Sequence, residues 1–492
     1  MPRRQMHAVC AAEAPLLAAL CALRTALDVP DGFPAEVLAE AERAAREPRL
    51  PDRDATSVPF FTIDPPTSTD LDQAMHLERR TGGGYRVRYA IADVAAFVRP
   101  GGTLDAEAHR RALTLYFPDD KVPLHPAVLS EGAASLLPDQ SCPALLWTID
   151  LDADGRAVTT DVRRALVRSR AKLDYTDVQR QIDSGTAEEP LALLKEVGLL
   201  RERLEAERGG ISLNVPEQEI VQEDHTYALE FRAPLAADGW NAQISLLTGM
   251  AAAELMTEAG TGILRTLPTA PGGAVARLRR TARALRIDWP HHVSYAQVVR
   301  SLDPANHRHA AFLQECTTLL RGAGYTAFSG GHLPDPAVHA AVAAAYTHCT
   351  APLRRLVDRY AGELCVAAVA GREPPAWVAE ALDALPKEMA EGSRRAGTVE
   401  RACVDIVEAA VLEGRVGEVF DAFVVDVREH EPDVGTVQLR DPAIVARVDG
   451  AGAALPLGEE LPVRLTQAGP LCAPPDAPQA DPAAAKVRFV PA

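Results

Sequence analysis

Two stretches of strand-like sequence, separated by a long helical region, constrain the fold of this chain most strongly. Between residues 58 and 167, apolar and polar side chains alternate in short runs such as YRVRYAIADVAAFV and ALLWTIDLD, with turn residues between them. Such alternation indicates antiparallel sheet. Helical spacing dominates residues 175–204 and about 240–412. The middle of the chain is therefore expected to be one large α+β domain.

The second strand-rich stretch follows Gly414 and predicts a small barrel. It holds five short runs: RVGEVFDAFVVDV, GTVQLRD, AIVARVDG, LPVRLTQ and KVRFV. Five strands of this length are what an OB-type barrel needs. Residues 469–484 are rich in Pro and Ala, which predicts a mobile loop before the last strand.

The start of the chain is Ala- and Leu-rich with helical spacing from Ala11 to Arg49, broken by turn residues at 29–32. We expect a small module of two or three helices. A packing role is favoured over a helix-turn-helix function, because few basic residues mark a recognition helix. Arg3 and Arg4 precede an apolar run, as in a secretion signal, but Glu13 interrupts that run.

Composition limits the class of protein. The chain has 492 residues, which suggests roughly two to four domains. Its eight cysteines are scattered without a C-x-x-C pair, as expected of buried thiols in a reducing cytoplasm. No window is apolar for long enough to span a membrane. We therefore expect a soluble, cytoplasmic protein, taken to be a monomer, and the sequence indicates no protein partner.

The formal net charge of −17 would repel RNA, so any contact with nucleic acid must be local. Basic residues do cluster along the chain, although each cluster alone is more often a solvated helix face than a binding surface. The clusters are Arg163, Arg164, Arg168, Arg170 and Lys172; Arg277, Arg279, Arg280, Arg283 and Arg286; and Arg354, Arg355 and Arg359.

The strongest chemical signal is the segment TIDPPTSTDLDQAM, residues 62–75. Two prolines stiffen a turn after Asp64, and Asp70 and Asp72 share one side of an extended chain, so three carboxylates are expected to converge. Like charges held together favour a divalent cation, and carboxylate oxygens suit Mg²⁺, with Mn²⁺ as a possible substitute. Taken alone, such a segment is more often a solvated loop.

Together with the later Ala90–Val94 segment, AIADV, this loop resembles the catalytic domain of the ribonuclease II (RNB) family, whose pattern has four aspartates here. Asp64, Asp70 and Asp72 match the first three positions, and Gln73 occupies the fourth. The resemblance implies that these four residues hold the metal and that Asp70 and Asp72 are catalytic. A carboxamide can ligate Mg²⁺ but cannot neutralise it, so Gln73 is expected to weaken one ion's binding.

Three further segments carry the resemblance in the same order. LDAEAHRRALTLYFPD resembles the family segment whose tyrosine stacks on a base, here Tyr116, and its alternative is a half-buried strand-end tyrosine. YTHCTAPLRRLVDRY is similar to the family's arginine signature, although Ala351 and Leu356 depart from it. It implies a catalytic Arg354 that binds RNA together with Arg355, where the residues alone suggest an ordinary basic helix start. TVERACVD implies an RNA-contacting Glu400, or a helix-surface carboxylate.

The resemblance covers residues 58–412, and the terminal barrel looks like the family's S1 domain. We therefore expect a helical domain at residues 1–56, an RNB catalytic domain at 57–412 and an S1-like OB barrel at 413–492. Instead of the family's two cold-shock barrels, about 55 mostly helical residues precede the catalytic domain. This departure leaves RNA selectivity and affinity open.

The activity implied by the resemblance is processive, hydrolytic 3′-to-5′ degradation of single-stranded RNA to nucleoside 5′-monophosphates. The alternatives are a catalytically impaired RNB-like RNA-binding regulator and a metal-dependent hydrolase of another phosphodiester. Retention of Asp64, Asp70, Asp72 and Arg354 favours the enzyme over the regulator.

Overall fold

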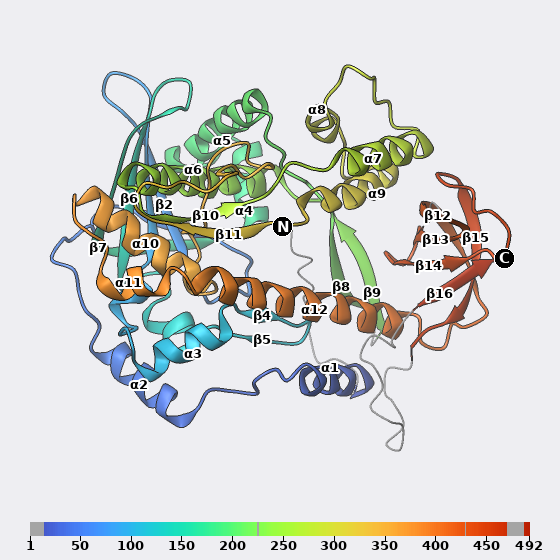
Figure 1. The fold of residues 1–492 in the computed structure, drawn as a ribbon, viewed down its shortest axis with the longest axis horizontal. Helices are drawn as coiled ribbons and strands as arrows, with labels where there is room; N and C mark the ends of the chain where they lie inside the picture. The colour runs from blue at the N-terminus through green and yellow to red at the C-terminus, as the bar shows by residue number, and fades with distance from the viewer. Residues whose placement is uncertain (1–13, 224–225, 429, 470–486) are drawn as a thin grey trace.

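The computed structural model describes residues 14–223, 226–428, 430–469 and 487–492 (Figure 1). Nearly all of the predicted loop at residues 469–484 lies outside these ranges, as do Arg3 and Arg4. Within the described ranges, no helix combines the length and the apolar character that crossing a membrane requires.

The first strand-rich segment forms a closed five-stranded barrel, the first barrel. Its strands are β1 (Phe60–Ile63), β2 (Gln73–Arg79), β3 (Tyr85–Ala92), β6 (Ser141–Leu151) and β7 (Ala157–Leu173). Side chains alternate as the sequence predicted, and Val87, Tyr89 and Trp147 are fully buried. The strands pair antiparallel except for β1 and β7, which are parallel. The predicted antiparallel sheet is thus corrected to a barrel with one parallel seam.

The long strand β7 explains this closure. Its residues 157–168 pair with β6, and its residues 169–173 continue past the end of β6 to pair with β1. An open five-stranded sheet would expose unpaired backbone groups along two edges, and closure removes both edges.

Between β3 and β6 the chain leaves the barrel and builds one side of the site. This insertion contains η1 (Val94–Ala96), α3 (Thr103–Arg111), β4 (Leu115–Tyr116), β5 (Lys121–Val122) and the one-turn segment η2 (Leu129–Ala133). Strands β4 and β5 form a two-stranded hairpin, the β4–β5 hairpin. The N-terminal helices α1 (Ala14–Ala26) and α2 (Ala35–Arg46) lie on this side of the molecule (Figure 1).

Further helices lie around the first barrel, and the last of them runs on to the C-terminal part of the molecule (Figure 1). They are α4 (Tyr175–Asp183), α5 (Glu189–Arg208), α6 (Ala236–Ala259), α10 (Leu356–Val369), α11 (Ala376–Ala381) and the long α12 (Leu385–Val411). Trp240 of α6 and Tyr360 of α10 belong to the same apolar cluster as Trp147 of the barrel. Gly362 permits the close approach of α10, because a Cβ there would lie 2.5 Å from Cδ1 of Leu145.

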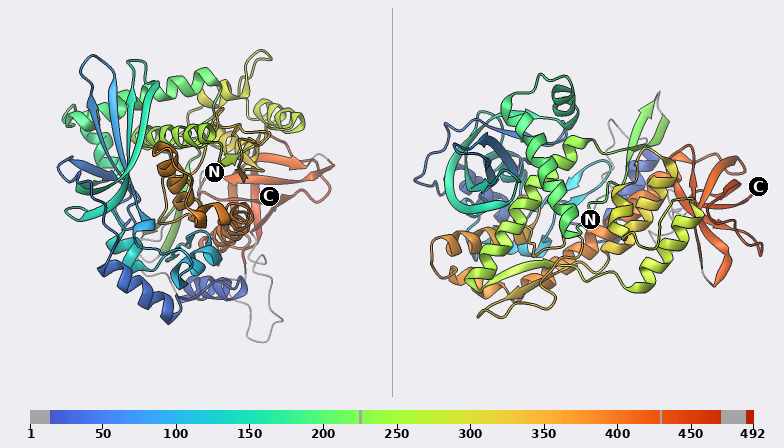
Figure 2. Two further views of the ribbon diagram at one scale, coloured as in Figure 1. Left: turned by 60° about the vertical axis from the view of Figure 1, so that its left-hand side comes forward. Right: turned by 90° about the horizontal axis from the view of Figure 1, so that it is seen from above.

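Two hairpins and a group of short helices interrupt the region predicted as helical. The hairpins pair β8 (Glu217–Glu223) with β9 (Thr226–Arg232), and β10 (Gly262–Thr266) with β11 (Gly324–Phe328). Between β10 and β11 lie α7 (Gly272–Ala284), α8 (Tyr295–Arg300), α9 (His307–Cys316) and η3 (Thr317–Leu320). These short helices lie next to the C-terminal end of the molecule (Figure 2).

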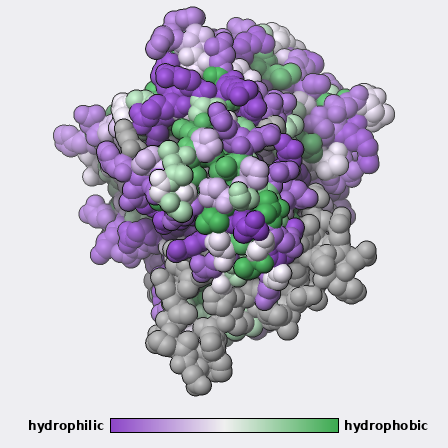
Figure 3. All heavy atoms as spheres, turned by 90° about the vertical axis from the view of Figure 1, so that its right-hand side faces the viewer, coloured by the Kyte–Doolittle hydropathy of each residue, from purple (hydrophilic) through white to green (hydrophobic). Residues whose placement is uncertain are grey.

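The second strand-rich segment forms the predicted small barrel, here called the C-terminal barrel. Its strands are β12 (Val419–Arg428), β13 (Glu431–Leu439), β14 (Val445–Asp449), β15 (Glu460–Gln467) and β16 (Arg488–Pro491), and the sheet is closed. Val437, Val463 and Phe489 fill its centre. Seen from this end, hydrophobic side chains gather near the middle of the face, among hydrophilic ones (Figure 3).

The C-terminal barrel is packed on two sides. Its Phe420 and Val424 share an apolar cluster with α1 and α12. Its Phe423 and Val425 share another with α7, α8 and α9. Two helices are present in the described part of the N-terminal segment, where two or three were predicted, but α1 packs in the first of these clusters and α2 in a third, beside the first barrel. The proposed boundary at residue 56 stays a prediction.

Candidate active site

The acidic loop, residues 64–72, connects β1 to β2. Asp64 directly follows β1, and its backbone N–H donates to the carbonyl of Leu173 at 3.0 Å. The prolines at 65 and 66 end the strand. Lys172 Nζ donates to the carbonyls of Pro66 and Ser68, both at 2.6 Å. The loop is thereby fixed against the end of β7.

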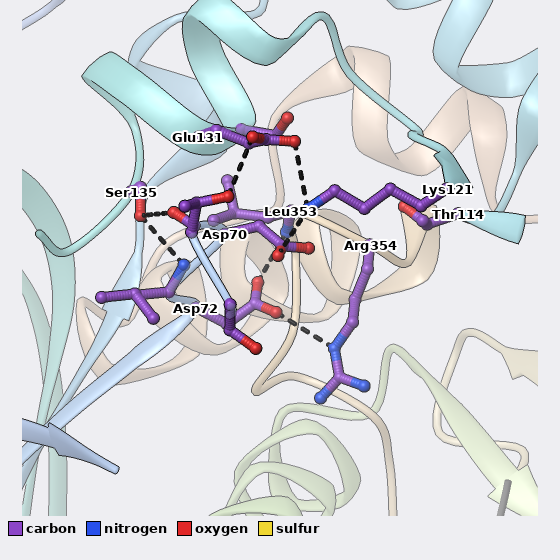
Figure 4. A network of polar contacts seen from close by, with 12 residues as sticks. Asp70, Asp72, Thr114, Lys121, Glu131, Ser135, Leu353 and Arg354 are labelled. Carbon is purple, nitrogen blue, oxygen red and sulfur yellow. Dashed lines mark hydrogen bonds and ion pairs between the residues drawn. The ribbon is translucent and has the colours of Figure 1, made fainter. Parts of the chain in front are cut away.

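Asp72 joins the acidic loop to the arginine motif, residues 346–360. Its Oδ1 accepts a hydrogen bond from the Leu353 N–H at 2.8 Å, and its Oδ2 accepts one from Arg354 Nε at 3.1 Å (Figure 4). The carboxylate is 5 % exposed. Two motifs that lie 282 residues apart in the chain therefore meet at one buried carboxylate.

Asp70 is held by a residue that sequence reasoning did not single out. Lys121 Nζ, on β5, lies 2.8 Å from Asp70 Oδ1 and 3.0 Å from Glu131 Oε1 (Figure 4). Ser135 supports the same part of the loop, because its Oγ accepts from the Leu71 N–H and donates to the Thr69 carbonyl. No sequence signal marks an isolated lysine as the partner of a distant aspartate.

The electrostatics of the site suit a cation. Burial raises the pKa of Asp64 to about 7, and the positive charge of Arg354 only partly offsets this effect. Burial likewise raises the pKa of Asp72 to about 7 against Arg354 and the Leu353 N–H. The charge of Asp70 raises both pKa values further. Carboxylates placed where their charge is poorly compensated are chemically suited to a divalent ion.

The convergence of the three carboxylates is looser than the sequence suggested. Asp64, Asp70 and Asp72 interact electrostatically, but Asp70 is paired with Lys121 and Asp72 with Arg354. Among the residues that the structure describes, no three acidic, His or Cys side chains are grouped as a ready metal site. The donor set fits a divalent cation in chemistry, while two of its members are engaged by cationic side chains.

Both polar atoms of the Gln73 amide are hydrogen-bonded within the protein. Its Oε1 accepts from the Tyr89 hydroxyl at 2.5 Å, and its Nε2 donates to the Thr350 carbonyl at 2.7 Å. Thr350 Oγ1 is in turn 2.8 Å from Ser245 Oγ on α6. Gln73 thus ties β2 to β3 and to the arginine motif.

The two adjacent arginines have different surroundings. Arg354 points to the acidic loop, whereas Arg355 binds Asp358 through Nε at 2.8 Å and Nη2 at 2.7 Å. Asp358 also accepts the Ala351 N–H at 2.7 Å. Although burial lowers the pKa of Arg355, Asp358 outweighs it and the net shift is upwards. These contacts favour a structural role for Arg355, at the start of α10.

Tyr116 lies beside Arg354. The strand that leads to it runs along the arginine motif, because the Thr114 N–H donates to the Arg354 carbonyl at 3.1 Å and Leu113 pairs with Arg355. Tyr116 is half-buried and interacts electrostatically with the Arg354 guanidinium. Its position is compatible with a stacking platform next to the carboxylates.

Two further residues, Glu400 and Tyr175, lie on the helices α12 and α4. Glu400 is half-buried on α12 and interacts electrostatically with Cys403. Tyr175, at the start of α4, was not predicted. Burial and the nearby Asp64 raise its pKa, and its hydroxyl accepts from Asn241 Nδ2 at 2.9 Å. Helix position alone could not show that Tyr175 faces Asp64.

Comparison with known proteins shows which family the chain belongs to. The RNB domain model matches residues 52–370, and the model of the RNase II-type exonuclease C-terminal S1 domain matches residues 418–470. Ribonuclease R of Aquifex aeolicus is 26 % identical over 432 residues, which cover 81 % of this chain and 59 % of that protein. The chain therefore spans less than two thirds of that relative.

Solved structures show the same fold. RNase R of Mycoplasma genitalium, in complex with ribose-methylated single-stranded RNA, has a TM-score of 0.82 at 18 % identity, over 97 % of this chain and 78 % of that one. The yeast pseudonuclease Ssd1 has a TM-score of 0.62 at 16 % identity, over 86 % of this chain and 55 % of that one. The RNB match covers more than half of the residues, the S1 match falls on the C-terminal barrel, and the chain therefore belongs to the RNB family.

Proposed function

We propose that this protein is a metal-dependent, hydrolytic exoribonuclease that degrades single-stranded RNA processively from the 3′ end and releases nucleoside 5′-monophosphates. One observation carries the proposal most: Asp72, buried at the end of the acidic loop, is bound by the backbone of Leu353 and the guanidinium of Arg354. A carboxylate and a guanidinium, a group that can bind phosphate oxygens, thus lie side by side, and this pairing supports cleavage of a phosphodiester.

The roles of the acidic residues follow from their chemistry. Asp64, Asp70 and Asp72 would hold a divalent cation, with Mg²⁺ expected and Mn²⁺ a possible substitute. When bound, such an ion supplies a nucleophilic water and stabilises the leaving oxygen. Lys121 holds Asp70 in place, and would share that carboxylate with the ion. Gln73 contributes no charge and is already bonded to Tyr89 and Thr350.

The residues on the RNA side have complementary roles. Arg354 contacts Asp72 through Nε, and its terminal nitrogens point away from that carboxylate (Figure 4). They are therefore placed to bind the oxygens of the phosphate that is cut. Tyr116 would stack on a base next to this phosphate, an interaction worth about 1–3 kcal/mol and tolerant of sequence. Arg355 and Glu400 would act more indirectly.

A second function, an RNA-binding regulator with impaired catalysis, is favoured by one observation. Gln73 replaces a carboxylate of the family pattern, and its amide is fixed by two hydrogen bonds within the protein. A related fold is also present in a pseudonuclease. Against this alternative, Asp64, Asp70, Asp72 and Arg354 are all retained, and Asp72 and Arg354 are in contact.

A single assay separates the two functions. Single-stranded RNA labelled at its 5′ end is incubated with the protein and Mg²⁺, alongside the variant Asp72→Asn, which keeps the size of the side chain. We expect stepwise shortening by the wild type and no shortening by Asp72→Asn, with RNA binding retained by both. Binding without shortening by the wild type would support the regulator. Normal cleavage by Asp72→Asn would refute the assignment of the site.

A further inference from the structure

The β4–β5 hairpin has one face toward the active site and the other toward the N-terminal helix. Tyr116 and Lys121 are paired across the two strands, so their side chains share a face. On that face, Tyr116 interacts electrostatically with Arg354, and Lys121 forms an ion pair with Asp70. Leu115 and Phe117 alternate with Tyr116 and belong to the apolar cluster that contains α1 and α12. The hairpin therefore lies between α1 and the site.

The tip of this hairpin is bound by one residue of α1. Arg24 donates to both oxygens of Asp119, at 3.1 Å from Nη1 and 2.7 Å from Nη2. Its guanidinium carbon also lies 4.2 Å from the centre of the Phe117 ring. The Phe117 N–H donates to the Asp120 carbonyl at 2.8 Å, which closes the turn. Arg24 thus binds both the side chain and the ring at the turn between Tyr116 and Lys121.

Several features of the setting favour this contact. The side chains of Arg24 and Asp119 are 17 % and 18 % exposed, although Asp119 as a whole residue is exposed, so water screens the pair in part. The geometry is bidentate, and a cation over an aromatic ring adds attraction. By contrast, a hairpin of two residues per strand has little stability of its own. The position of this hairpin therefore depends on what packs against it.

We propose that Arg24 is a positioning residue of the active site: by holding the tip of the β4–β5 hairpin, it keeps Tyr116 beside Arg354 and Lys121 on Asp70. The inference rests on the proposed function, because Tyr116 and Lys121 act on RNA and on the acidic loop. It gives the N-terminal helix a role in catalysis without any contact to RNA. Arg24 itself touches neither Arg354 nor Asp70.

The test compares Arg24→Gln, which removes the charge, with Arg24→Lys, which keeps it. Single-stranded RNA with 2-aminopurine near its 3′ end is bound in EDTA, where stacking on Tyr116 should quench the fluorescence. We expect Arg24→Gln to lose most of the quenching and, with Mg²⁺, to slow single-turnover cleavage by about 10- to 100-fold, as misplacement of site groups does. Arg24→Lys keeps the charge but cannot bind both oxygens of Asp119 in parallel, so it should recover only part of both signals.

A matched control separates positioning from general stability. Arg86 makes a similar bidentate pair with Asp150, at 2.7 and 2.9 Å, on the first barrel. Arg86 lies five residues along β3 from Ile91, the partner of Gln73, or about 16 Å away along the strand. Arg86→Gln should lower the melting temperature like Arg24→Gln, yet leave the quenching and the cleavage rate unchanged.

The outcomes distinguish a failure of this inference about Arg24 from a failure of the proposed nuclease function. If the wild type binds RNA but does not shorten it, the nuclease assignment fails, and the quenching experiment still decides the role of Arg24. Hydrogen exchange of residues 113–122, measured without RNA, tests whether Arg24 keeps the β4–β5 hairpin in place. The exchange should be faster in Arg24→Gln than in Arg86→Gln. Unchanged quenching and exchange in Arg24→Gln would overturn the proposal.

Discussion

At position 73, a carboxylate would favour metal binding, whereas the amide of Gln73 suits the hydrogen bonds that the folded protein makes there. Replacing Gln73 with Asp would restore the family's fourth carboxylate, but would place an oxygen acceptor near the Thr350 carbonyl in place of a donor. We expect Gln73→Asp to lower the stability of the metal-free protein by about 1–3 kcal/mol, the usual cost of an unsatisfied buried group. With Mg²⁺ present, the added charge should lower the metal concentration needed for cleavage and leave activity equal or higher.

The control for this prediction is Gln73→Asn, which shortens the side chain equally and adds no charge. Melting curves with and without Mg²⁺, together with cleavage rates across a Mg²⁺ titration, provide the comparison. The stabilisation by Mg²⁺ should be greater for Gln73→Asp than for Gln73→Asn. If both variants respond to Mg²⁺ in the same way, residue 73 does not lie close enough to the ion to matter.

The raised pKa values of Asp64 and Asp72 predict a pH-dependent effect of metal on stability. Their ordinary pKa is 3.8 and their folded-state pKa about 7, so the folded protein keeps protons that the unfolded chain releases between these values. At these two groups the free energy of unfolding therefore falls as pH rises from about 4 to about 7, and stays low above that range. A divalent cation replaces the protons, and should stabilise the protein more when the carboxylates are ionised.

Melting temperatures in Mg²⁺ and in EDTA, at about pH 5.5 and about pH 8, check this prediction. The increase caused by Mg²⁺ should be clearly larger at the higher pH. It should shrink in Asp72→Asn, which lacks one of the two titrating carboxylates. An equal effect of Mg²⁺ at both pH values would mean that the ion binds elsewhere.

Sequence reasoning placed Asp72 and Arg354 in one site because both residues belong to motifs, and the structure brings the two into contact. It could not find Lys121 or Tyr89, which contact Asp70 and Gln73. Neither residue is part of a motif, and the partner of each depends on how the chain folds in three dimensions. The resemblance assigned the catalytic role to Arg354, but it could not show that Arg355 is bound by Asp358 instead of facing the acidic loop.

At the level of elements, alternation predicted the strands that are buried on one face but missed β2. Its sequence, QAMHLER, contains no β-branched residue, so local propensity is weak. Pairing with β1 and β3 on its two sides makes it a strand. The parallel seam between β1 and β7 was missed for a similar reason, because it joins segments about one hundred residues apart. All five strands of the C-terminal barrel were predicted because each is short and bounded by turns.

Gly458 tests how closely the C-terminal barrel must approach α7. Its φ is +82°, and a Cβ there would lie 1.9 Å from the Ala284 carbonyl oxygen at the end of that helix. Gly458→Ala should therefore force the barrel loop away from α7, in addition to the roughly 1–2 kcal/mol of backbone strain at positive φ. We expect a clear loss of stability and faster hydrogen exchange in α7.

Gly452, in the same barrel, is the matched control. Its φ of +91° imposes a similar backbone strain, but no atom lies within 4 Å of the Cβ position. Gly452→Ala should thus lose only the strain energy and leave the exchange of α7 unchanged. Equal losses of stability in the two variants would show that contact with Ala284 does not hold the barrel in place.

On the scale of the whole molecule, the apolar clusters cross the boundaries that the sequence suggested. One cluster joins α1, α12, the β4–β5 hairpin and the C-terminal barrel, and another joins that barrel to α7, α8 and α9. Helix α12 links the two ends of the molecule (Figure 1). The barrel is therefore packed as part of the body of the protein, although its strands alone match an S1 domain.

This packing predicts cooperative unfolding of the full chain. Val399, Ile406 and Val407 of α12 are buried in the cluster that the barrel shares, and each such side chain loses about 1.5–3 kcal/mol if it becomes fully exposed. The full chain should unfold in one calorimetric transition. A chain ending at residue 412 should melt at a lower temperature and bind a hydrophobic dye while still folded. Two separate transitions in the full chain, or an unchanged melting temperature in the shorter one, would instead mean that the barrel is an independent domain and that the clusters contribute little free energy across the boundary.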